Sequence, residues 1–149
     1  MTGRAAPLLA AAAAVLAAAA PAALAAPPAP EPGQETIVGT AGADVLVGSP
    51  RGDLIRALRG PDTVRGLGAR DTAYAGPGAD RVRGGRGGDH LFTGRGPDRV
   101  RSGAGNDLVE LRPGGGTDIV DCGPGLDEVI GVGADDTVTG CETRRSRER

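Results

Sequence analysis

The chain has 149 residues with 27 Gly and 12 Pro, but only one Phe, one Tyr and no Trp. This length allows one modest domain, and the scarcity of large side chains excludes a conventional globular core. The formal net charge of −2 is too weak to indicate a nucleic-acid partner. High Gly and Pro content is typical of disordered chains unless a strict period is present.

Residues 1–25 have the parts of a secretory signal peptide: a basic start at Arg4, an Ala- and Leu-rich run, and small residues at the end. Ala23-Leu24-Ala25 fits an A-x-A site, so we predict cleavage after Ala25. The alternative is a retained membrane anchor, because the run approaches the necessary length. The Pro-rich residues 26–38 then form an extended linker. We expect a secreted, extracellular protein without a membrane span after cleavage.

A nine-residue repeat begins at Gly39. Position six of every unit is aspartate, with two extra residues entering within 111–116: Asp44, Asp53, Asp62, Asp71, Asp80, Asp89, Asp98, Asp107, Asp118, Asp127 and Asp136. Position eight is always apolar: Leu46, Ile55, Val64, Ala73, Val82, Leu91, Val100, Val109, Val120, Val129 and Val138. Position four is glycine in eight of the eleven units, with Arg51, Ala69 and Ala134 as the exceptions, and position two is glycine in six.

A nine-residue period is not helical, so the repeat predicts strands joined by turns. We expect position eight to point inward from a short strand, and the glycines to supply backbone freedom in a five-residue turn. Two units complete one coil of about 18 residues, and coils stack at about 4.8 Å. Residues 39–142 therefore predict an all-β, right-handed parallel β-roll (β-solenoid) with two nonapeptide repeats per coil. Its thin core needs Val and Leu rather than Trp.

Stacking places aspartates from alternate units above one another in two rows. Asp44, Asp62, Asp80 and Asp98 lie on one edge, and Asp53, Asp71, Asp89 and Asp107 on the other. Like charges about 5 Å apart repel strongly where the dielectric constant is low. A hard divalent cation between turns would supply the counter-charge, and Ca²⁺ accepts the carboxylate and carbonyl oxygens that such turns offer.

The unit resembles the RTX, or haemolysin-type, calcium-binding nonapeptide G-G-x-G-x-D-x-U-x. "GGRGGDHLF", residues 84–92, fits every fixed position, and "AGPGADRVR", "TGRGPDRVR" and "SGAGNDLVE" miss only the first glycine. The resemblance covers about residues 39–139 and implies a β-roll that binds several Ca²⁺ ions and often folds only with them. Toxins and proteases with these repeats usually carry a C-terminal export signal and a separate catalytic or pore-forming region, whereas this chain has the pattern of an N-terminal signal.

The resemblance also implies a set of metal ligands. The best-formed turns offer the side chains of Asp80, Asp89, Asp98 and Asp107 and the carbonyls around Gly76, Gly78, Gly85, Gly87, Gly94, Gly96, Gly103 and Gly105. Asp44, Asp53, Asp62 and Asp71 follow poorer turns, which contain Arg51, Leu58, Leu67 and Ala69-Arg70 where the pattern has glycine, so such turns could be empty or closed by an arginine. Asp118 and Asp127 complete the predicted ligands beyond the insertion.

The last coil needs a cap for its open edge, and residues 121–142 carry it. Cys122 and Cys141 are 19 residues apart, one more than a coil, so stacking brings them within disulfide reach. The alternative is two free thiols or a redox pair. Residues 143–149 are predicted to be a frayed basic tail.

Arginines gather on one predicted outer face at positions 65, 81, 83, 99 and 101, and Tyr74 and Phe92 lie one coil apart on the other, beside His90. The arginine face could bind an anionic cell-surface polymer or a glycan, or could be only a charged, soluble face. The aromatic pair could stack on a sugar or could stabilise neighbouring strands. No specific nucleic-acid partner is indicated.

The single histidine lies at an outward position, and the carboxylates are spaced for metal rather than for paired acid–base catalysis. We therefore expect no enzyme activity. The favoured function is calcium binding by a secreted protein that folds or is stabilised on meeting Ca²⁺ outside the cell. The alternatives are an adhesive module with structural calcium and a small secreted enzyme acting on polysaccharide.

Overall fold

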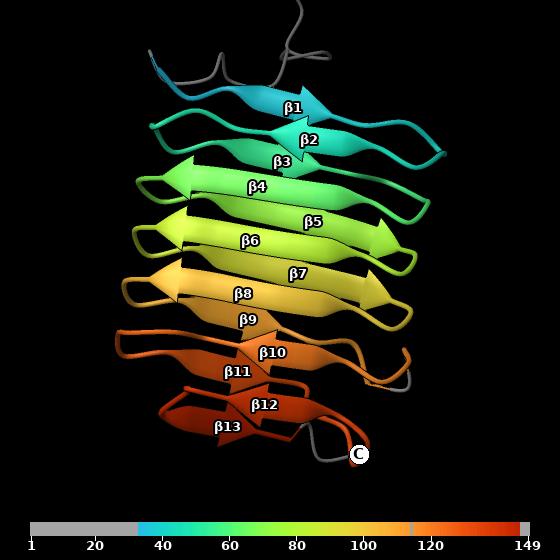
Figure 1. The fold of residues 1–149 in the computed structure, drawn as a ribbon, viewed down its shortest axis with the longest axis vertical. Coiled ribbons are helices and arrows are strands. Elements are labelled where there is room, and N and C mark those ends of the chain that lie inside the picture. The colour runs from blue at the N-terminus through green and yellow to red at the C-terminus, as the bar shows by residue number, and fades with distance from the viewer. Residues whose placement is uncertain (1–32, 114, 147–149) are drawn as a thin grey trace, which may run out of the picture.

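The computed structural model describes residues 33–113 and 115–146, and all its regular elements are strands. They form two stacked parallel sheets whose strands alternate along the chain (Figure 1). The seven-stranded sheet, called the odd sheet, contains β1 (Thr36–Val38), β3 (Leu54–Arg56), β5 (Thr72–Pro77), β7 (His90–Arg95), β9 (Leu108–Glu110), β11 (Glu128–Ile130) and β13 (Thr143–Arg145). The six-stranded even sheet contains β2 (Val45–Val47), β4 (Thr63–Gly68), β6 (Arg81–Arg86), β8 (Arg99–Ala104), β10 (Ile119–Asp121) and β12 (Thr137–Thr139).

The strand register confirms a β-solenoid with two repeats per coil. Val64 pairs with Val82, and Ala73 with Leu91, so each residue lies beside the residue 18 positions later. Across the insertion the offset becomes 20, because Val100 pairs with Val120. The two extra residues therefore enlarge one turn and leave the strand register intact.

The core is a double row of small apolar side chains between the two sheets. All eleven residues at position eight are buried, as the repeat predicts. Position one also points inward, which the sequence analysis missed: Ala57, Ala75, Leu111 and Cys122 join the same buried cluster. Each coil therefore buries more apolar surface than one side chain per repeat, and the roll needs no large aromatic residue in its interior.

The turns are shorter than predicted, because the five central strands, β4 to β8, extend through six residues each. Only three residues, such as 78–80 or 87–89, separate successive strands there. At these tight corners the backbone must enter the left-handed region, which glycine does most readily. Leu58, Leu67 and Ala69 adopt the same conformation, with φ of 82°, 88° and 65°, so the degenerate turns follow the same path as the glycine turns.

Replacing Leu67 by glycine should therefore stabilise the protein. A non-glycine residue in this region costs roughly 1–2 kcal/mol, and the Leu67 side chain is 46% exposed, so its removal forfeits little buried contact. We expect the free energy of unfolding of Leu67→Gly to rise by about 1 kcal/mol in urea denaturation. Val47→Gly, an exposed strand position with ordinary backbone geometry, is the control and should destabilise. A loss of stability in Leu67→Gly would contradict this account.

The solenoid extends further at both ends than the sequence predicted. β1 lies within the segment 26–38 that we interpreted as a linker, and it pairs with β3 through Ile37 and Ile55. β13 lies within the predicted tail 143–149 and pairs with β11. Each end continues a sheet that would otherwise present an unpaired strand edge. The predicted signal peptide, residues 1–25, lies outside the described residues. Within the described part of the chain, no helix is long and apolar enough to cross a membrane.

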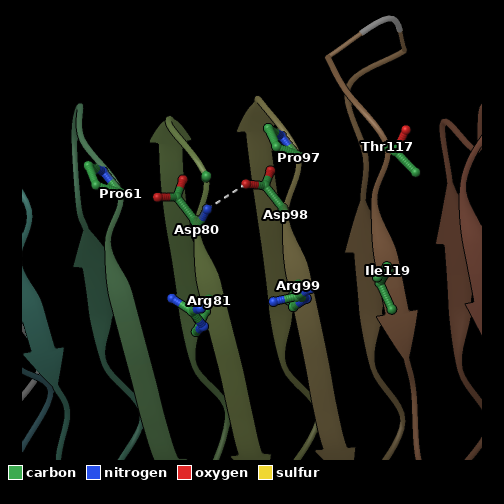
Figure 2. Close-up of a pocket in the computed structure, with 9 residues that line it drawn as sticks. Pro61, Asp80, Arg81, Pro97, Asp98, Arg99, Thr117 and Ile119 are labelled. Carbon is green, nitrogen blue, oxygen red and sulfur yellow. Dashed lines mark hydrogen bonds between the residues drawn. The ribbon is translucent and has the colours of Figure 1, made fainter.

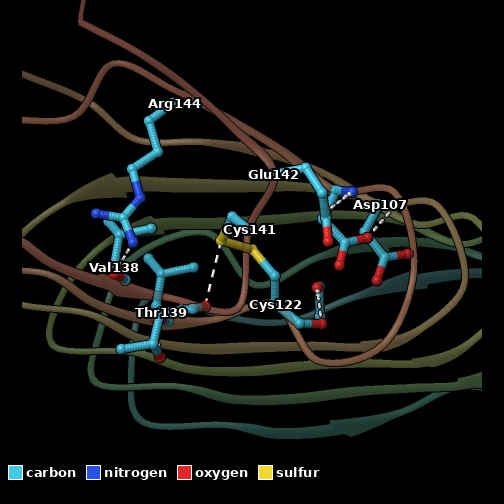
Figure 3. The surroundings of a disulfide bond; sticks show 10 residues. Asp107, Cys122, Val138, Thr139, Cys141, Glu142 and Arg144 are labelled. Atoms are coloured by element: carbon cyan, nitrogen blue, oxygen red, sulfur yellow. Dashed lines mark hydrogen bonds between the residues drawn. A yellow bond between two sulfur atoms is a disulfide. The ribbon is translucent and has the colours of Figure 1, made fainter.

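The predicted disulfide between Cys122 and Cys141 is present, with the two Cα atoms 5.3 Å apart (Figure 3). It joins the buried end of β10 to the short connection between β12 and β13. Just beyond it, the Arg144 guanidinium donates a hydrogen bond to the carbonyl oxygen of Val138. The disulfide and this contact hold the last half-coil against the stack.

Removing the disulfide should cost roughly 3 kcal/mol, the value for a loop of about 20 residues. We expect Cys122→Ala/Cys141→Ala to unfold at lower urea concentration than the unaltered chain, both in calcium. Reduction of the unaltered protein should reproduce the loss, whereas the double variant should not respond to reductant. Equal stability of the two oxidised proteins would show that the bond does not stabilise the cap.

Candidate metal centre

The aspartates at position six form two continuous rows, one along each edge of the solenoid. Those before the even strands make the even ladder (Asp44, Asp62, Asp80, Asp98, Asp118 and Asp136), and those before the odd strands make the odd ladder (Asp53, Asp71, Asp89, Asp107 and Asp127). Nine of these eleven side chains are buried, all except Asp44 and Asp136, each exposing at most 3% of its surface. Their carboxylates face the interior, on the same side of each strand as the core residues at position eight.

Each ladder is held by a repeated backbone contact. The N–H of one aspartate donates a hydrogen bond to the Oδ1 atom of the aspartate one coil later, as from Asp62 to Asp80 at 2.7 Å and from Asp71 to Asp89 at 2.9 Å. Figure 2 shows the same bond from Asp80 to Asp98, which measures 2.9 Å. One oxygen of each carboxylate is therefore committed to joining successive coils.

The other carboxylate oxygen has no protein partner over most of both ladders. The Oδ2 atoms of seven aspartates are buried and accept no hydrogen bond: Asp62, Asp71, Asp80, Asp89, Asp98, Asp107 and Asp127. Native structures leave few buried polar atoms unsatisfied, because an unpaired one costs about 1–3 kcal/mol and more when it is charged. Seven in regular succession indicate that a ligand outside the polypeptide belongs there.

The ladders also lack a neutralising side chain. Among the described residues the ion pairs join His90 to Glu110, Arg101 to Asp121 and Arg145 to Glu128, and none involves an aspartate of either ladder. Burial therefore raises the pKa of Asp71, Asp80 and Asp89 from 3.8 to about 6 and that of Asp98 to about 7, and the charge of the neighbouring aspartate adds to the rise. The pKa values of Asp62, Asp118 and Asp127 are raised for the same two reasons.

Backbone carbonyl oxygens of the glycine turns also lie at the edges of the solenoid. The carbonyl oxygens of Gly78 and Gly87 point along the stack toward the glycine of the next coil, so that a Cβ added to Gly96 or Gly105 would lie 1.6 or 1.9 Å from them. Within the described chain no three His, Cys, Asp or Glu side chains gather as a metal cluster. A cation at these edges would thus be held by paired carboxylates together with carbonyls, an all-oxygen set suited to Ca²⁺.

The structure divides the predicted aspartates into two kinds. Asp44 and Asp53 have both carboxylate oxygens satisfied, because the N–H groups of Thr40 and Ser49 each donate to Oδ2 at 2.6 Å. The hydroxyl of Thr40 also contacts both oxygens of Asp44. A Ser or Thr at position two, where the best units have glycine, is the signal for these self-satisfied turns, and the sequence analysis overlooked it. Asp62 and Asp71 belong with the unsatisfied group despite their irregular turns.

Two glutamates that the repeat pattern does not include extend the odd ladder. The N–H of Glu35 donates to Oδ1 of Asp53 at 3.0 Å, and Oε2 of Glu142 accepts the N–H of Asp127 at 2.6 Å. Glu142 follows Asp127 by 15 residues rather than 18, and the longer glutamate side chain compensates for the shortened last turn. Glu35 keeps the 18-residue spacing to Asp53 with glutamate in place of aspartate, whereas only Glu142 departs from the spacing.

The raised pKa values make the calcium-free protein sensitive to pH. Between about pH 4 and pH 7 the folded chain holds protons on Asp71, Asp80, Asp89 and Asp98 that the unfolded chain has released. The free energy of unfolding therefore falls as pH rises through this window. In calcium-free buffer we expect a higher melting temperature at pH 5 than at pH 8, measured by circular dichroism. A melting temperature that rises from pH 5 to pH 8 would contradict the buried, unneutralised ladders.

A family model, the RTX calcium-binding nonapeptide repeat (4 copies), matches residues 31–50, 47–82, 56–91, 74–109 and 83–120. The matches overlap and together span residues 31–120, more than half of the chain. No curated protein matches the chain. The matched repeats contain the strands β1 to β9, most of β10 and both aspartate ladders up to Asp118. Repeats of this kind imply calcium binding, and with the parallel solenoid they show that the chain belongs to the RTX calcium-binding nonapeptide repeat family.

Proposed function

We propose that this protein is a secreted, non-catalytic calcium-binding protein whose β-roll is stabilised, or formed, when Ca²⁺ binds outside the cell. The observation that carries the proposal is the series of seven buried Oδ2 atoms without a partner. Calcium binding follows from the repeat family, while secretion, the absence of catalysis and the set of ligands are parts of the proposal.

The fold provides most of each proposed site before the ion arrives. The backbone bond to Oδ1 fixes the orientation of each carboxylate, and stacking places successive carboxylates about 4.8 Å apart. A divalent cation between them supplies the positive charge that the side chains of the ladders lack. Asp80, Asp89, Asp98 and Asp107, with the carbonyls of their glycine turns, are the proposed main ligands, and Asp62 and Asp71 extend the series.

Binding and folding are coupled in this proposal. The unfolded chain separates the ladder residues by 18 positions, so it offers no assembled site, and an ion that binds only the folded form stabilises it by mass action. Because burial raises the pKa of most of the ladder carboxylates, protons compete with the ion for them at low pH. Calcium should therefore stabilise the roll more at pH 8 than at pH 5. A protein of this kind would gain its stability on leaving a calcium-poor compartment.

The surroundings of the one histidine favour a structural role for it. His90 Nε2 lies 2.7 Å from Glu110 Oε1 on the outer face of the odd sheet, and its ring lies 4.2 Å from that of Phe92. The rings of Tyr74 and Phe92 stack on each other with centroids 4.5 Å apart, which favours their role as a cross-strand pair over a sugar platform. Families of this type are typically non-catalytic.

Equilibrium dialysis of the chain lacking residues 1–25 tests the proposal. We expect several calcium ions bound per chain at about 0.1–1 mM, the range of extracellular modules, and much weaker binding of Mg²⁺, which prefers a compact octahedral site. Secretion is tested separately by expressing the full-length chain and looking in the culture medium for protein that has been cut after Ala25. Absence of calcium binding at 10-fold higher concentration would refute the function, whereas retention in the cell would refute only its location.

A further inference from the structure

Five arginines cover the outer face of the even sheet in two columns. Strand pairing places Arg81 directly beside Arg99, and Arg65, Arg83 and Arg101 in a row on β4, β6 and β8. All five side chains are exposed. Neighbouring strands lie about 4.8 Å apart, so each column repeats a positive charge at that interval. Figure 2 shows Arg81 and Arg99 at the same level on adjacent strands.

This arginine face lacks matching negative charge. Within the described residues Arg65, Arg81, Arg83 and Arg99 make no ion pair, and Arg101 Nε lies 4.0 Å from Asp121 Oδ2, at the outer limit of such a contact. The aspartates next in sequence, Asp80 and Asp98, point to the opposite side of their strands and are buried. Like charges directly opposite each other on paired strands are destabilising, so the folded protein alone gives no reason for the arrangement.

The chemistry of the face indicates a partner with regularly spaced oxyanions. Arginine offers a planar fork of donors that binds carboxylate or sulfate groups in pairs of hydrogen bonds. Arg81, Arg83, Arg99 and Arg101 line a shallow groove together with Ile119, Asp121 and Thr139. These residues come from four neighbouring strands, and such an open surface suits a linear polymer that crosses several strands rather than a small ligand that needs enclosure.

The position of the aromatic residues makes single-stranded nucleic acid an unfavourable partner for the arginine face. Proteins that bind single strands without sequence preference combine basic grooves with aromatic side chains on which bases stack. Tyr74 and Phe92 lie on the odd sheet and are stacked on each other. The strand register places Thr63 and Ile119 on either side of the Arg81–Arg99 column, and Val47 and Asp121 on either side of the column formed by Arg65, Arg83 and Arg101, so neither column is flanked by an aromatic residue.

We propose that the arginine face of the even sheet is a docking surface for a linear polysaccharide that carries carboxylate or sulfate groups. The polymer lies across β4, β6 and β8 and supplies the negative charges that the face lacks. This interaction uses the outer side of the strands, whereas the proposed calcium sites use their inner side and the turns. It therefore uses none of the proposed calcium ligands and depends on calcium only through the folding of the roll.

Immobilised dextran sulfate and hyaluronate are the two charged probes, and neutral dextran is the matched polymer control. We expect the chain lacking residues 1–25, in 1 mM calcium, to bind at least one charged polymer and not dextran, and the binding to weaken as salt screens the charges. The probe that binds more tightly distinguishes sulfate from carboxylate as the preferred group. Equal binding to dextran, or tighter binding to single-stranded DNA than to both charged polymers, would overturn the proposal.

Arg83→Thr/Arg101→Thr tests the face itself, because threonine suits an exposed strand position and already occurs in this column at Thr139, beyond Asp121. Loss of two ion pairs should weaken binding roughly tenfold. Arg59→Thr/Arg112→Thr removes the same charge from exposed turn positions and should change binding by less than about twofold. The melting temperature of Arg83→Thr/Arg101→Thr should not fall, since the substitution relieves repulsion, and this separates lost docking from lost folding. Equal weakening by both double variants would refute a specific face.

Discussion

Replacing Gly96 by alanine is expected to destabilise the roll strongly, by forcing apart two coils at its centre. Gly96 has a φ of 120°, and a Cβ at this position would lie 1.6 Å from the carbonyl oxygen of Gly78 in the preceding coil. The left-handed backbone alone costs roughly 1–2 kcal/mol for a residue with a side chain. Because the clash is with backbone, the coils must separate, and we expect a total loss of about 3 kcal/mol or more.

The matched control is Gly42→Ala, another glycine at position four. A Cβ at Gly42 would meet only the Thr40 hydroxyl oxygen, at 3.7 Å, which is ordinary contact. Urea denaturation of both variants in calcium should show a change within about 0.5 kcal/mol for Gly42→Ala. If the two alanine variants were equally stable, the close stacking of turns would not be what requires glycine at position four.

Replacing Asp89 by asparagine is expected to move the stability of the calcium-free and calcium-bound protein in opposite directions. The asparagine Oδ1 atom can still accept the N–H of Asp71, so the backbone contact between coils is kept. The substitution removes a buried charge whose pKa is raised to about 6 by burial and by the charges of Asp71 and Asp107. The calcium-free melting temperature should therefore rise at pH 8.

The same change should weaken calcium binding, because affinity depends on the number of charged ligands. We expect the calcium concentration at half-saturation to increase roughly tenfold, a loss of about 1.4 kcal/mol. Asp44→Asn is the matched control, since Thr40 already satisfies the Asp44 carboxylate and no metal is needed there. An equal effect of both substitutions on calcium binding would contradict the division of the ladders into satisfied and unsatisfied aspartates.

The regular parts of the sequence predicted the fold well, for a simple physical reason. One residue in each repeat, position eight, is always apolar, and one, position six, is always aspartate, so the period alone determines which residues stack. The pairing of Val64 with Val82 and the disulfide from Cys122 to Cys141 both follow from counting coils. The two ladders were predicted by the same counting.

The irregular parts could not be predicted from the period. β13 and Glu142 belong to the roll although they fall outside the period, because Glu142 follows Asp127 by 15 residues and its longer side chain makes up the difference. β1 and Glu35 keep the 18-residue offset to β3 and Asp53, but glutamate in place of aspartate within a Pro-rich segment hid this unit. Position one was missed because its residues, such as Ala57 and Cys122, share burial but not residue type.

The turns with the poorest match to the pattern were also the hardest to interpret. Leu67 and Ala69 hold the glycine conformation although they carry side chains, so the backbone path was kept where the motif was lost. The satisfied carboxylates of Asp44 and Asp53 depend on donors from Thr40 and Ser49, whose role becomes visible only when the turn closes. From the sequence, the turns richest in glycine were predicted to be the best metal sites. In the structure, the turns differ instead in whether the aspartate Oδ2 atom already has a hydrogen-bond donor.

We expect the buried aspartate ladders to need calcium for stability at neutral pH. The decisive experiment is circular dichroism of the chain lacking residues 1–25, recorded at pH 7.5 during a calcium titration. We predict that the β-sheet signal or its thermal midpoint increases with a half-point at about 0.1–1 mM calcium, that chelator reverses the change, and that equal Mg²⁺ does not reproduce it. A chain with the same spectrum and the same melting temperature in chelator and in 10 mM calcium would contradict the claim.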